Sequence, residues 1–165
     1  MSKTRILMIC MGNICRSPTA EGVLRRKLEA AGLGDVVEVA SAGTHGHFHA
    51  GEAPDARAQK HAKARGYDLS KGRARRLAHD DFARFDWLLA MDEDNLAALR
   101  ASAPADSPAQ IALLMAHAGR FADVREVPDP YYGPPAGFDR VLDLIEDACD
   151  GLVKALQRRH GEGTS

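Results

Sequence analysis

The sequence is poor in cysteine and contains no apolar run of membrane-spanning length near its start. Only three cysteines occur among 165 residues, an odd number that is too small for the disulfide framework of a small secreted protein. The apolar stretch at residues 6–11 is too short to cross a membrane and lacks the flanks of a signal peptide. These absences predict a cytoplasmic protein without a membrane partner.

An excess of charge of either sign is also absent. Lysine and arginine total 22, aspartate and glutamate total 23, and the formal net charge is −1. A chain without a basic field has no general means of holding nucleic acid. We therefore expect no nucleic-acid partner, and any bound anion must be held by a local arrangement of residues.

The composition is typical of a folded domain, with 45% hydrophobic and 27% charged residues. The length also lies within the range of one domain. We predict that residues 1–157 form a single domain. Residues 158–165 are predicted to form a flexible tail, because the chain ends in a polar sequence with two glycines.

Short apolar runs alternate along the chain with helical patterns. The expected strands span residues 5–10, 36–40, 87–91 and 110–115, and the expected helices span residues 18–31, 54–65, 93–99 and 138–156. This alternation predicts an α/β fold, a doubly wound, four-stranded parallel sheet with helices on both faces. Such sheets bind ligands at the carboxyl ends of strands, where the strand order reverses, which makes the first loop the natural place for a site.

Several helix starts are marked by residues that commonly cap helices. Ser17 followed by Pro18 predicts an N-cap and a first helical residue. Asp55, Asp80 and Asp92 also lie at expected helix starts, where capping explains them without any chemistry.

The loop after the first strand, residues 10–17, reads CMGNICRS and is the main candidate site. Its backbone amides from Met11 through Arg16 have no expected strand or helix partner, so they can surround a tetrahedral oxyanion at the start of the next helix. The loop matches neither the nucleotide-binding P-loop nor the dinucleotide-binding motif, because Gly12 has no glycine companions. We expect a phosphate-binding loop of a different kind.

A cysteine and an arginine at the two ends of this loop indicate phosphoryl chemistry. Oriented amides, a helix N-terminus and Arg16 form a setting that stabilises a thiolate at Cys10. The planar guanidinium of Arg16 can bind two phosphate oxygens at once, which a lysine cannot do. Cys10 is therefore the candidate nucleophile and Arg16 the candidate phosphate clamp.

The motif from Cys10 to Pro18 resembles that of the low molecular weight protein tyrosine phosphatases. The resemblance continues at residues 41–44, 86–92 and 128–133, so it covers nearly the whole chain in order. It implies the phosphotyrosine phosphatase I-like fold and hydrolysis of phosphotyrosine monoesters through a phosphocysteine intermediate, with no metal or cofactor. The expected partners are phosphotyrosine proteins or peptides and a tyrosine kinase that produces them.

The same resemblance implies roles for individual residues. Asp129, which lies between two prolines, is the expected general acid and then the general base. Ser17 is expected to donate a hydrogen bond to the Cys10 sulfur, while Asn13 and Ser41 brace the loop from behind. The expected phosphate loop also contains Met11, Gly12, Ile14 and Cys15, and the expected aromatic rim consists of Phe48, Tyr131 and Tyr132.

Other reactive side chains of the sequence can be interpreted as functional or as structural residues. Cys15 is either the partner of Cys10 in a reversible disulfide, as the family pattern suggests, or a small packed residue. Cys149 lies on the apolar side of the last helix and is expected in the core. The alternating histidines of residues 45–49 resemble metal ligands, but a solvated loop is expected because no cysteine or carboxylate cluster lies near them.

Three other functions match parts of the pattern. An arsenate reductase on the same scaffold needs a relay of thiols, but no cysteine occurs between Cys15 and Cys149. A protein arginine phosphatase favours threonine at the position of Ile14. An inactive phosphotyrosine-binding module would have no use for the acid Asp129.

Overall fold

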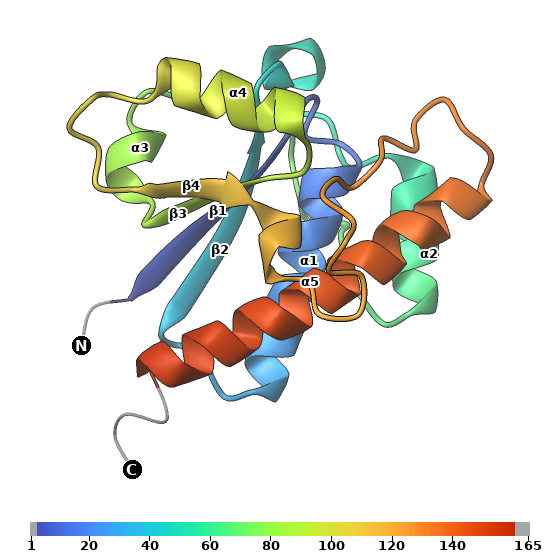
Figure 1. The fold of residues 1–165 in the computed structure, drawn as a ribbon. Helices are drawn as coiled ribbons and strands as arrows, with labels where there is room; N and C mark the ends of the chain where they lie inside the picture. Colours follow the sequence, from blue (N-terminus) through green and yellow to red (C-terminus); the bar gives the residue numbers. More distant parts are fainter. Residues whose placement is uncertain (1–2, 161–165) are drawn as a thin grey trace.

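The computed structural model describes residues 3–160 and places a parallel sheet between two layers of helices (Figure 1). The strands are β1 (Thr4–Cys10), β2 (Val37–Gly43), β3 (Trp87–Ala90) and β4 (Gln110–Leu113). The α-helices are α1 (Arg16–Ala30), α2 (Ala56–Ala64), α3 (Asp81–Arg84), α4 (Glu93–Ser102) and α5 (Ala136–His160), and the 3-10 helices are η1 (Gly46–His49) and η2 (Leu114–His117). The predicted α/β architecture is confirmed.

The strand order β2-β1-β3-β4 creates a reversal at β1. All pairs are parallel, and β1 lies between its partners, with Cys10 opposite Gly43 on one side and Ile9 opposite Ala90 on the other. The chain builds β2 on one side of β1 and then crosses over to build β3 on the other. The loop that follows Cys10 therefore lies at the switch point, where open α/β sheets bind their ligands.

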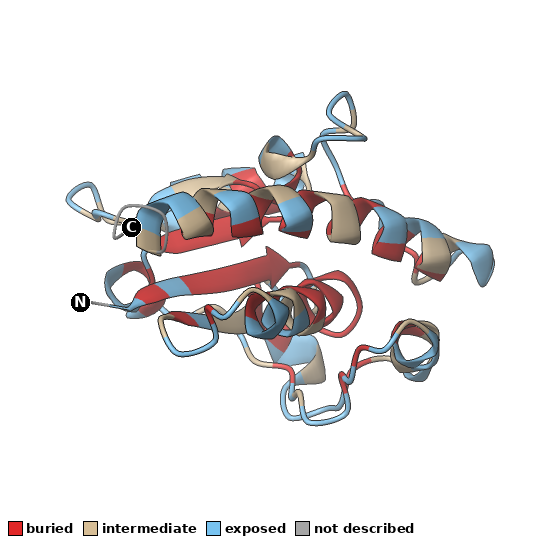
Figure 2. Ribbon diagram, turned by 90° about the horizontal axis from the view of Figure 1, so that it is seen from below, coloured by how far each residue is buried: buried red, intermediate tan, exposed pale blue. Residues whose placement is uncertain are grey.

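Helices cover both faces of the sheet. Because side chains alternate along a strand, Ile6 and Met8 of β1 pack in the core with α1, α2 and α5, whereas Leu7 and Ile9 pack with α3 and α4. Figure 2 shows largely buried strands and helices that are buried on one side and exposed on the other. Among residues 3–160, no helix combines the length and the apolar character that a bilayer span requires.

Helix α1 begins earlier than predicted. Its first residue is Arg16, and Cys15 occupies the N-cap position without a side-chain capping hydrogen bond, so the predicted cap at Ser17 is wrong. The Ser17 hydroxyl instead lies 2.9 Å from the Cys10 sulfur. Ser17 is itself a residue of the helix and does not act as its cap. Pro18 still falls within the first turn, where its missing N–H costs no hydrogen bond.

Two of the three predicted aspartate caps are confirmed. The carboxylate of Asp55 accepts backbone N–H groups from the first turn of α2, and that of Asp92 accepts one from the first turn of α4. The prediction for Asp80 is wrong, because its side chain makes no capping hydrogen bond. The buried carboxylate of Asp81 accepts the amide of Ala78 at 2.8 Å instead.

Other elements differ from the prediction at their ends. Strand β2 continues to Gly43 because it pairs with the whole of β1, and the last predicted strand ends at Leu113, where η2 begins. Helix α5 continues to His160, so the predicted tail is wrong for residues 158–160. The rest of that prediction, residues 161–165, lies outside the described residues. Cys149 is fully buried in α5, as predicted.

Candidate active site

The loop between β1 and α1 is lined with free backbone donors. The amide of Asn13 donates to the Sγ atom of Cys10 at 3.3 Å. Within the described part of the chain, the other amides of residues 11–16 donate to no protein atom. Together with the N-terminus of α1, which begins at Arg16, they form an arrangement suited to a tetrahedral oxyanion.

Asn13 holds this loop in its curled shape. Its φ of 58° lies in the left-handed region, which asparagine adopts more readily than most residues. Its Nδ2 atom donates to the hydroxyls of Ser17 and Ser41, at 2.9 Å each, and its Oδ1 atom accepts the amide of Arg75 at 2.9 Å. The structure therefore brings Asn13, Ser17 and Ser41 together behind Cys10.

The end of β2 approaches the loop so closely that only glycine fits. A Cβ atom at Gly43 would lie 2.5 Å from the carbonyl oxygen of Met11. The next two amides, those of Thr44 and His45, donate to the carbonyl oxygens of Cys10 and Met11 at 2.9 and 2.8 Å. The back of the loop is thus tied to the neighbouring strand.

The sulfur of Cys10 is buried at the base of this arrangement. Its Sγ atom lies 2.9 Å from the hydroxyl oxygen of Ser17 and accepts the Asn13 amide. The guanidinium of Arg16 is also buried. Burial acts to lower the pKa of Arg16, but Cys10 and the carboxylate of Asp92 raise it above its usual value. The guanidinium therefore stays positively charged.

Arg16 is held by a partner that the sequence interpretation missed. Its Nη1 atom donates to Oδ2 of Asp92 at 2.6 Å and to the carbonyl oxygen of Val127 at 3.1 Å. Asp92 was interpreted only as a helix cap. A signal was available, because Asp92 closely follows β3, and β3 ends beside β1 at the same edge of the sheet.

Asp129 lies at the rim of the site with its side chain half exposed. Its Oδ1 atom accepts the amide of Tyr131 at 3.1 Å, and its Oδ2 atom lies 3.8 Å from Nη2 of Arg16. The segment before it is anchored by the amide of Val127, which donates to the carbonyl oxygen of Met91 at 2.8 Å. The structure thus places a carboxylate next to the guanidinium of Arg16.

The aromatic residues predicted for the rim differ in exposure. Tyr131 is partly buried, and the guanidinium carbon of Arg57 lies 5.3 Å from its ring centroid. Tyr132 is 95% exposed and contacts Tyr131 edge to face. Phe48 is 67% exposed on η1, where its ring lies 4.3 Å from that of His47. Phe48 and Tyr132 are therefore open to solvent rather than enclosing the loop.

Cys15 is a free, buried thiol in the same loop, at the N-cap position of α1. Burial raises the pKa of this thiol above its ordinary value, and the nearby Asp55 carboxylate adds to the effect. Cys15 is thus held protonated. The surroundings of the two thiols differ, because the Cys10 sulfur lies beside the Asn13 amide and the Ser17 hydroxyl.

Comparisons with known proteins agree over nearly the whole chain. The family model described as low molecular weight phosphotyrosine protein phosphatase matches residues 5–162. A low molecular weight protein-tyrosine-phosphatase of Streptomyces coelicolor is 42% identical, over 94% of this chain and 94% of the relative. The human low molecular weight phosphotyrosine protein phosphatase is 36% identical, over 90% and 93%. A crystal structure of a protein tyrosine phosphatase from Entamoeba histolytica superposes with a TM-score of 0.90 at 37% identity, covering 94% of this chain and 98% of that one.

Proposed function

The chain belongs to the low molecular weight phosphotyrosine protein phosphatase family and is a phosphatase, and from that premise we propose that it hydrolyses phosphotyrosine monoesters through a phosphocysteine intermediate. The proposal rests mainly on the surroundings of the Cys10 sulfur. It lies in a loop whose amides, apart from that of Asn13, donate to no atom of residues 3–160, with the charged group of Arg16 held beside it and the carboxylate of Asp129 at the rim.

In the first step, the thiolate of Cys10 attacks the phosphorus atom in line with the tyrosyl oxygen. An S–P bond forms while the P–O bond to the tyrosine breaks. The loop amides and Arg16 bind the three equatorial oxygens, where negative charge is spread in the transition state. The Ser17 hydroxyl, 2.9 Å from the sulfur, stabilises the thiolate before the attack and after its release.

Asp129 moves the protons of both steps. Its carboxylic acid donates a proton to the departing phenolic oxygen, and the resulting carboxylate then takes a proton from the water that attacks the phosphocysteine. The S–P bond breaks, inorganic phosphate leaves and the Cys10 thiolate is restored. The amide of Tyr131 occupies Oδ1, so Oδ2 is the oxygen available for these transfers.

The depth of the nucleophile supports phosphotyrosine as the substrate. Cys10 is only 3% exposed, and the long phenyl group of phosphotyrosine reaches such a position more readily than the short side chain of phosphoserine. Tyr131, whose amide binds Asp129, supplies aromatic surface for the ring of the substrate, and the exposed Tyr132 and Phe48 are available to contact the residues around it. The partners are then phosphotyrosine proteins or peptides and the tyrosine kinase that phosphorylates them.

We also propose that the reaction needs no metal and takes place in the cytoplasm. Backbone amides and Arg16 already supply the positive charge that a metal would otherwise provide, and a reducing compartment keeps Cys10 active. Peroxide would oxidise Cys10 to a sulfenic acid, and attack by the Cys15 thiol would then form a disulfide and release water. Such a disulfide protects the nucleophile from irreversible oxidation.

Turnover of a set of substrates in EDTA tests this function. We expect rapid hydrolysis of a phosphotyrosine peptide, little hydrolysis of phosphoserine or phosphoarginine peptides, and inhibition by orthovanadate. A preference for phosphoarginine, thiol-dependent reduction of arsenate, or binding of the phosphotyrosine peptide without turnover would contradict it and favour one of the three alternatives. Loss of activity in EDTA would contradict the metal-independent mechanism.

A further inference from the structure

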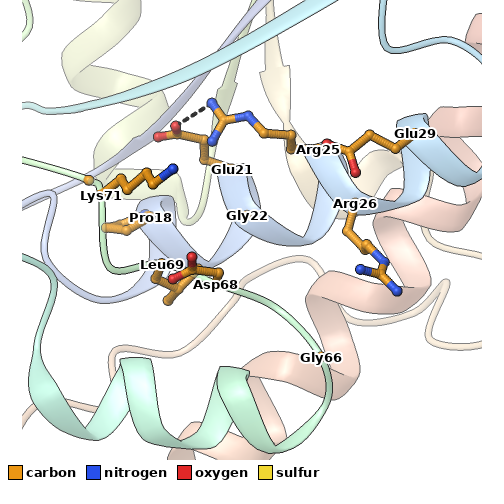
Figure 3. Close-up of a pocket in the computed structure, with 11 residues that line it drawn as sticks. Pro18, Glu21, Gly22, Arg25, Arg26, Glu29, Gly66, Asp68, Leu69 and Lys71 are labelled. Atoms are coloured by element: carbon orange, nitrogen blue, oxygen red, sulfur yellow. Dashed lines mark hydrogen bonds and ion pairs between the residues drawn. The ribbon is translucent and has the colours of Figure 1, made fainter.

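A chain of side-chain hydrogen bonds leads from the Cys10 sulfur to Glu21 at a groove on the surface. The groove has a volume of about 470 Å³ and lies between α1 and residues 66–72 (Figure 3). Its wall on α1 includes Glu21 and Arg25, which form an ion pair at 2.7 Å. Glu21 was not identified as a site residue from the sequence.

Hydrogen bonds connect this carboxylate to the sulfur. The Ser41 hydroxyl donates to Oε1 of Glu21 at 2.6 Å. Nδ2 of Asn13 donates to the hydroxyls of Ser41 and Ser17 at 2.9 Å each. The Ser17 hydroxyl in turn lies 2.9 Å from Sγ of Cys10.

The number of available hydrogens sets the direction of each bond. An ionised carboxylate only accepts, and a serine hydroxyl has a single hydrogen to donate. Because Ser41 donates its hydrogen to Glu21, it can only accept from Asn13. The Oδ1 atom of Asn13 accepts the amide of Arg75, which leaves both Nδ2 hydrogens for the two serines.

The last bond follows from this arrangement. Ser17 accepts from Asn13, so its own hydrogen is directed to the Cys10 sulfur, and a donated hydrogen bond favours the thiolate. Bonds in such a chain polarise one another, so the acceptor oxygen that Glu21 offers to Ser41 strengthens each of them. Glu21 is therefore the final acceptor of the chain that leads through Ser41 and Asn13 to the donor Ser17.

Arg25 keeps that acceptor in place. Its Nη2 atom donates to Oε2 of Glu21 at 2.7 Å and to the carbonyl oxygen of Val39 at 3.0 Å. Arg25 is about half exposed, whereas the side chain of Glu21 is only 19% exposed. One carboxylate oxygen is thus clamped from the groove, and the other receives the Ser41 hydroxyl.

We propose that Glu21 is a positioning residue for the nucleophile, which holds the hydroxyl of Ser41 so that Asn13 and Ser17 direct their hydrogens toward the Cys10 sulfur. This rests on Cys10 being the nucleophile proposed above. The other groups that face Cys10, namely Arg16, Cys15 and Asp129, make no contact with Glu21 in the described structure and stay the same in every variant used below.

Alkylation of Cys10 measures the effect without relying on phosphatase activity. Iodoacetate labelling at one fixed pH, with the label located on Cys10 by fragment-ion mass spectrometry, reports thiolate reactivity. We expect Glu21→Ala to slow labelling and to lower kcat by about 3- to 10-fold with little change in KM, in line with the loss of one hydrogen bond. Glu21→Gln keeps an acceptor oxygen for Ser41 and should restore both rates to within about twofold of wild type.

The matched control is Glu29→Ala, which changes a carboxylate of the same helix and the same groove. Its labelling and turnover should equal those of wild type. Ser41→Ala breaks the chain one step further in and should reproduce the effect of Glu21→Ala, and the two substitutions together should be no worse than Ser41→Ala alone.

Three results would overturn the role of Glu21: unchanged labelling in Glu21→Ala, an equal loss in Glu21→Gln, or fully additive losses in the double variant. If Glu21→Ala does not fold, Ser41→Ala and Glu21→Gln still decide the question. Any of these results would leave turnover by wild type and its loss in Cys10→Ser intact, so failure here is distinct from failure of the proposed function.

Discussion

The guanidinium of Arg16 is fixed from behind by Asp92, whose Oδ2 atom accepts a hydrogen bond from Nη1 at 2.6 Å. The other carboxylate oxygen of Asp92 accepts the amide of Asn95 at 2.8 Å and caps α4. One side chain thus joins Arg16 of the β1 loop to the helix that follows β3. In the proposed mechanism, a guanidinium held in this way is already oriented when phosphate arrives, which is how preorganised charge assists catalysis.

Replacement of Asp92 by asparagine separates these two tasks. Asp92→Asn keeps an oxygen that can cap α4 but removes the charged partner of Arg16. We expect kcat/KM for a phosphotyrosine peptide to fall by about 10- to 100-fold, the range for a lost hydrogen bond between charged groups. The free energy of unfolding should fall as well, because the buried guanidinium of Arg16 loses its charged partner. Asp80→Asn is the control, because Asp80 makes no capping contact. Equal kcat/KM values for the two variants would show that Asp92 does not orient the clamp.

Asp129→Ala should lower kcat for a phosphotyrosine peptide by about 10²- to 10⁴-fold, the usual cost of removing a general acid and base. The decrease in kcat/KM should be smaller for p-nitrophenyl phosphate, whose leaving group departs without a proton. Asp123→Ala, an exposed change in the same segment, should retain wild-type rates. Steady-state kinetics with both substrates would refute the assignment if the loss in kcat/KM were the same for each.

Local sequence patterns predicted the sheet because the information lies within a few residues. The strand that ends at Cys10 is a continuous apolar run, as expected for a strand buried on both faces, and the loop after it carries the proposed nucleophile and the proposed clamp arginine six residues apart. The position of that loop at the switch point followed from the alternation of strands and helices alone.

Contacts between distant residues could not be predicted in the same way. Arg16 and Asp92 are 76 residues apart in the sequence, and Asp92 also looked like an ordinary cap, which it is. The start of α1 was placed too late because the Ser17 hydroxyl binds a sulfur across the loop instead of capping the helix. Glu21 was missed for a similar reason, since its acceptor role exists only once β2 brings Ser41 beside α1.

Gly43→Ala should damage both the loop and the fold. The added Cβ atom would lie 2.5 Å from the carbonyl oxygen of Met11 and 3.0 Å from the amide nitrogen of Asn13, so the backbone must move. Forced overpacking of this kind costs about 1–3 kcal/mol of the free energy of unfolding, and the displaced loop should also lose activity. Gly34→Ala is the control, because its nearest contact of 3.7 Å is ordinary. Urea unfolding that is the same for both variants would contradict the close approach.

Asp147 should stabilise the fold in a pH-dependent manner. Burial acts to raise the pKa of this carboxyl, but hydrogen bonds from the backbone amides of residues 119–121 outweigh it and hold the pKa below its ordinary value. A depressed pKa gives stability that is complete above the unfolded value of about 3.9 and is lost as the pH falls through the folded value.

The free energy of unfolding of wild type should therefore exceed that of Asp147→Asn by about 1–3 kcal/mol at pH 6 to 7. The difference should shrink once the pH falls below about 4. Asp150→Asn removes a more exposed ion pair with Lys27 and should change stability by less than about 1 kcal/mol. A difference between wild type and Asp147→Asn that stays constant down to pH 2 would argue against this role for Asp147.

Turnover by Cys10→Ser decides whether the reaction passes through phosphocysteine, because serine keeps the shape of the side chain and removes only the thiolate. With a phosphotyrosine peptide in EDTA, we expect no turnover above background, while binding of the peptide to the loop amides and Arg16 is retained. Turnover by Cys10→Ser at a rate comparable to wild type would contradict a mechanism that passes through phosphocysteine.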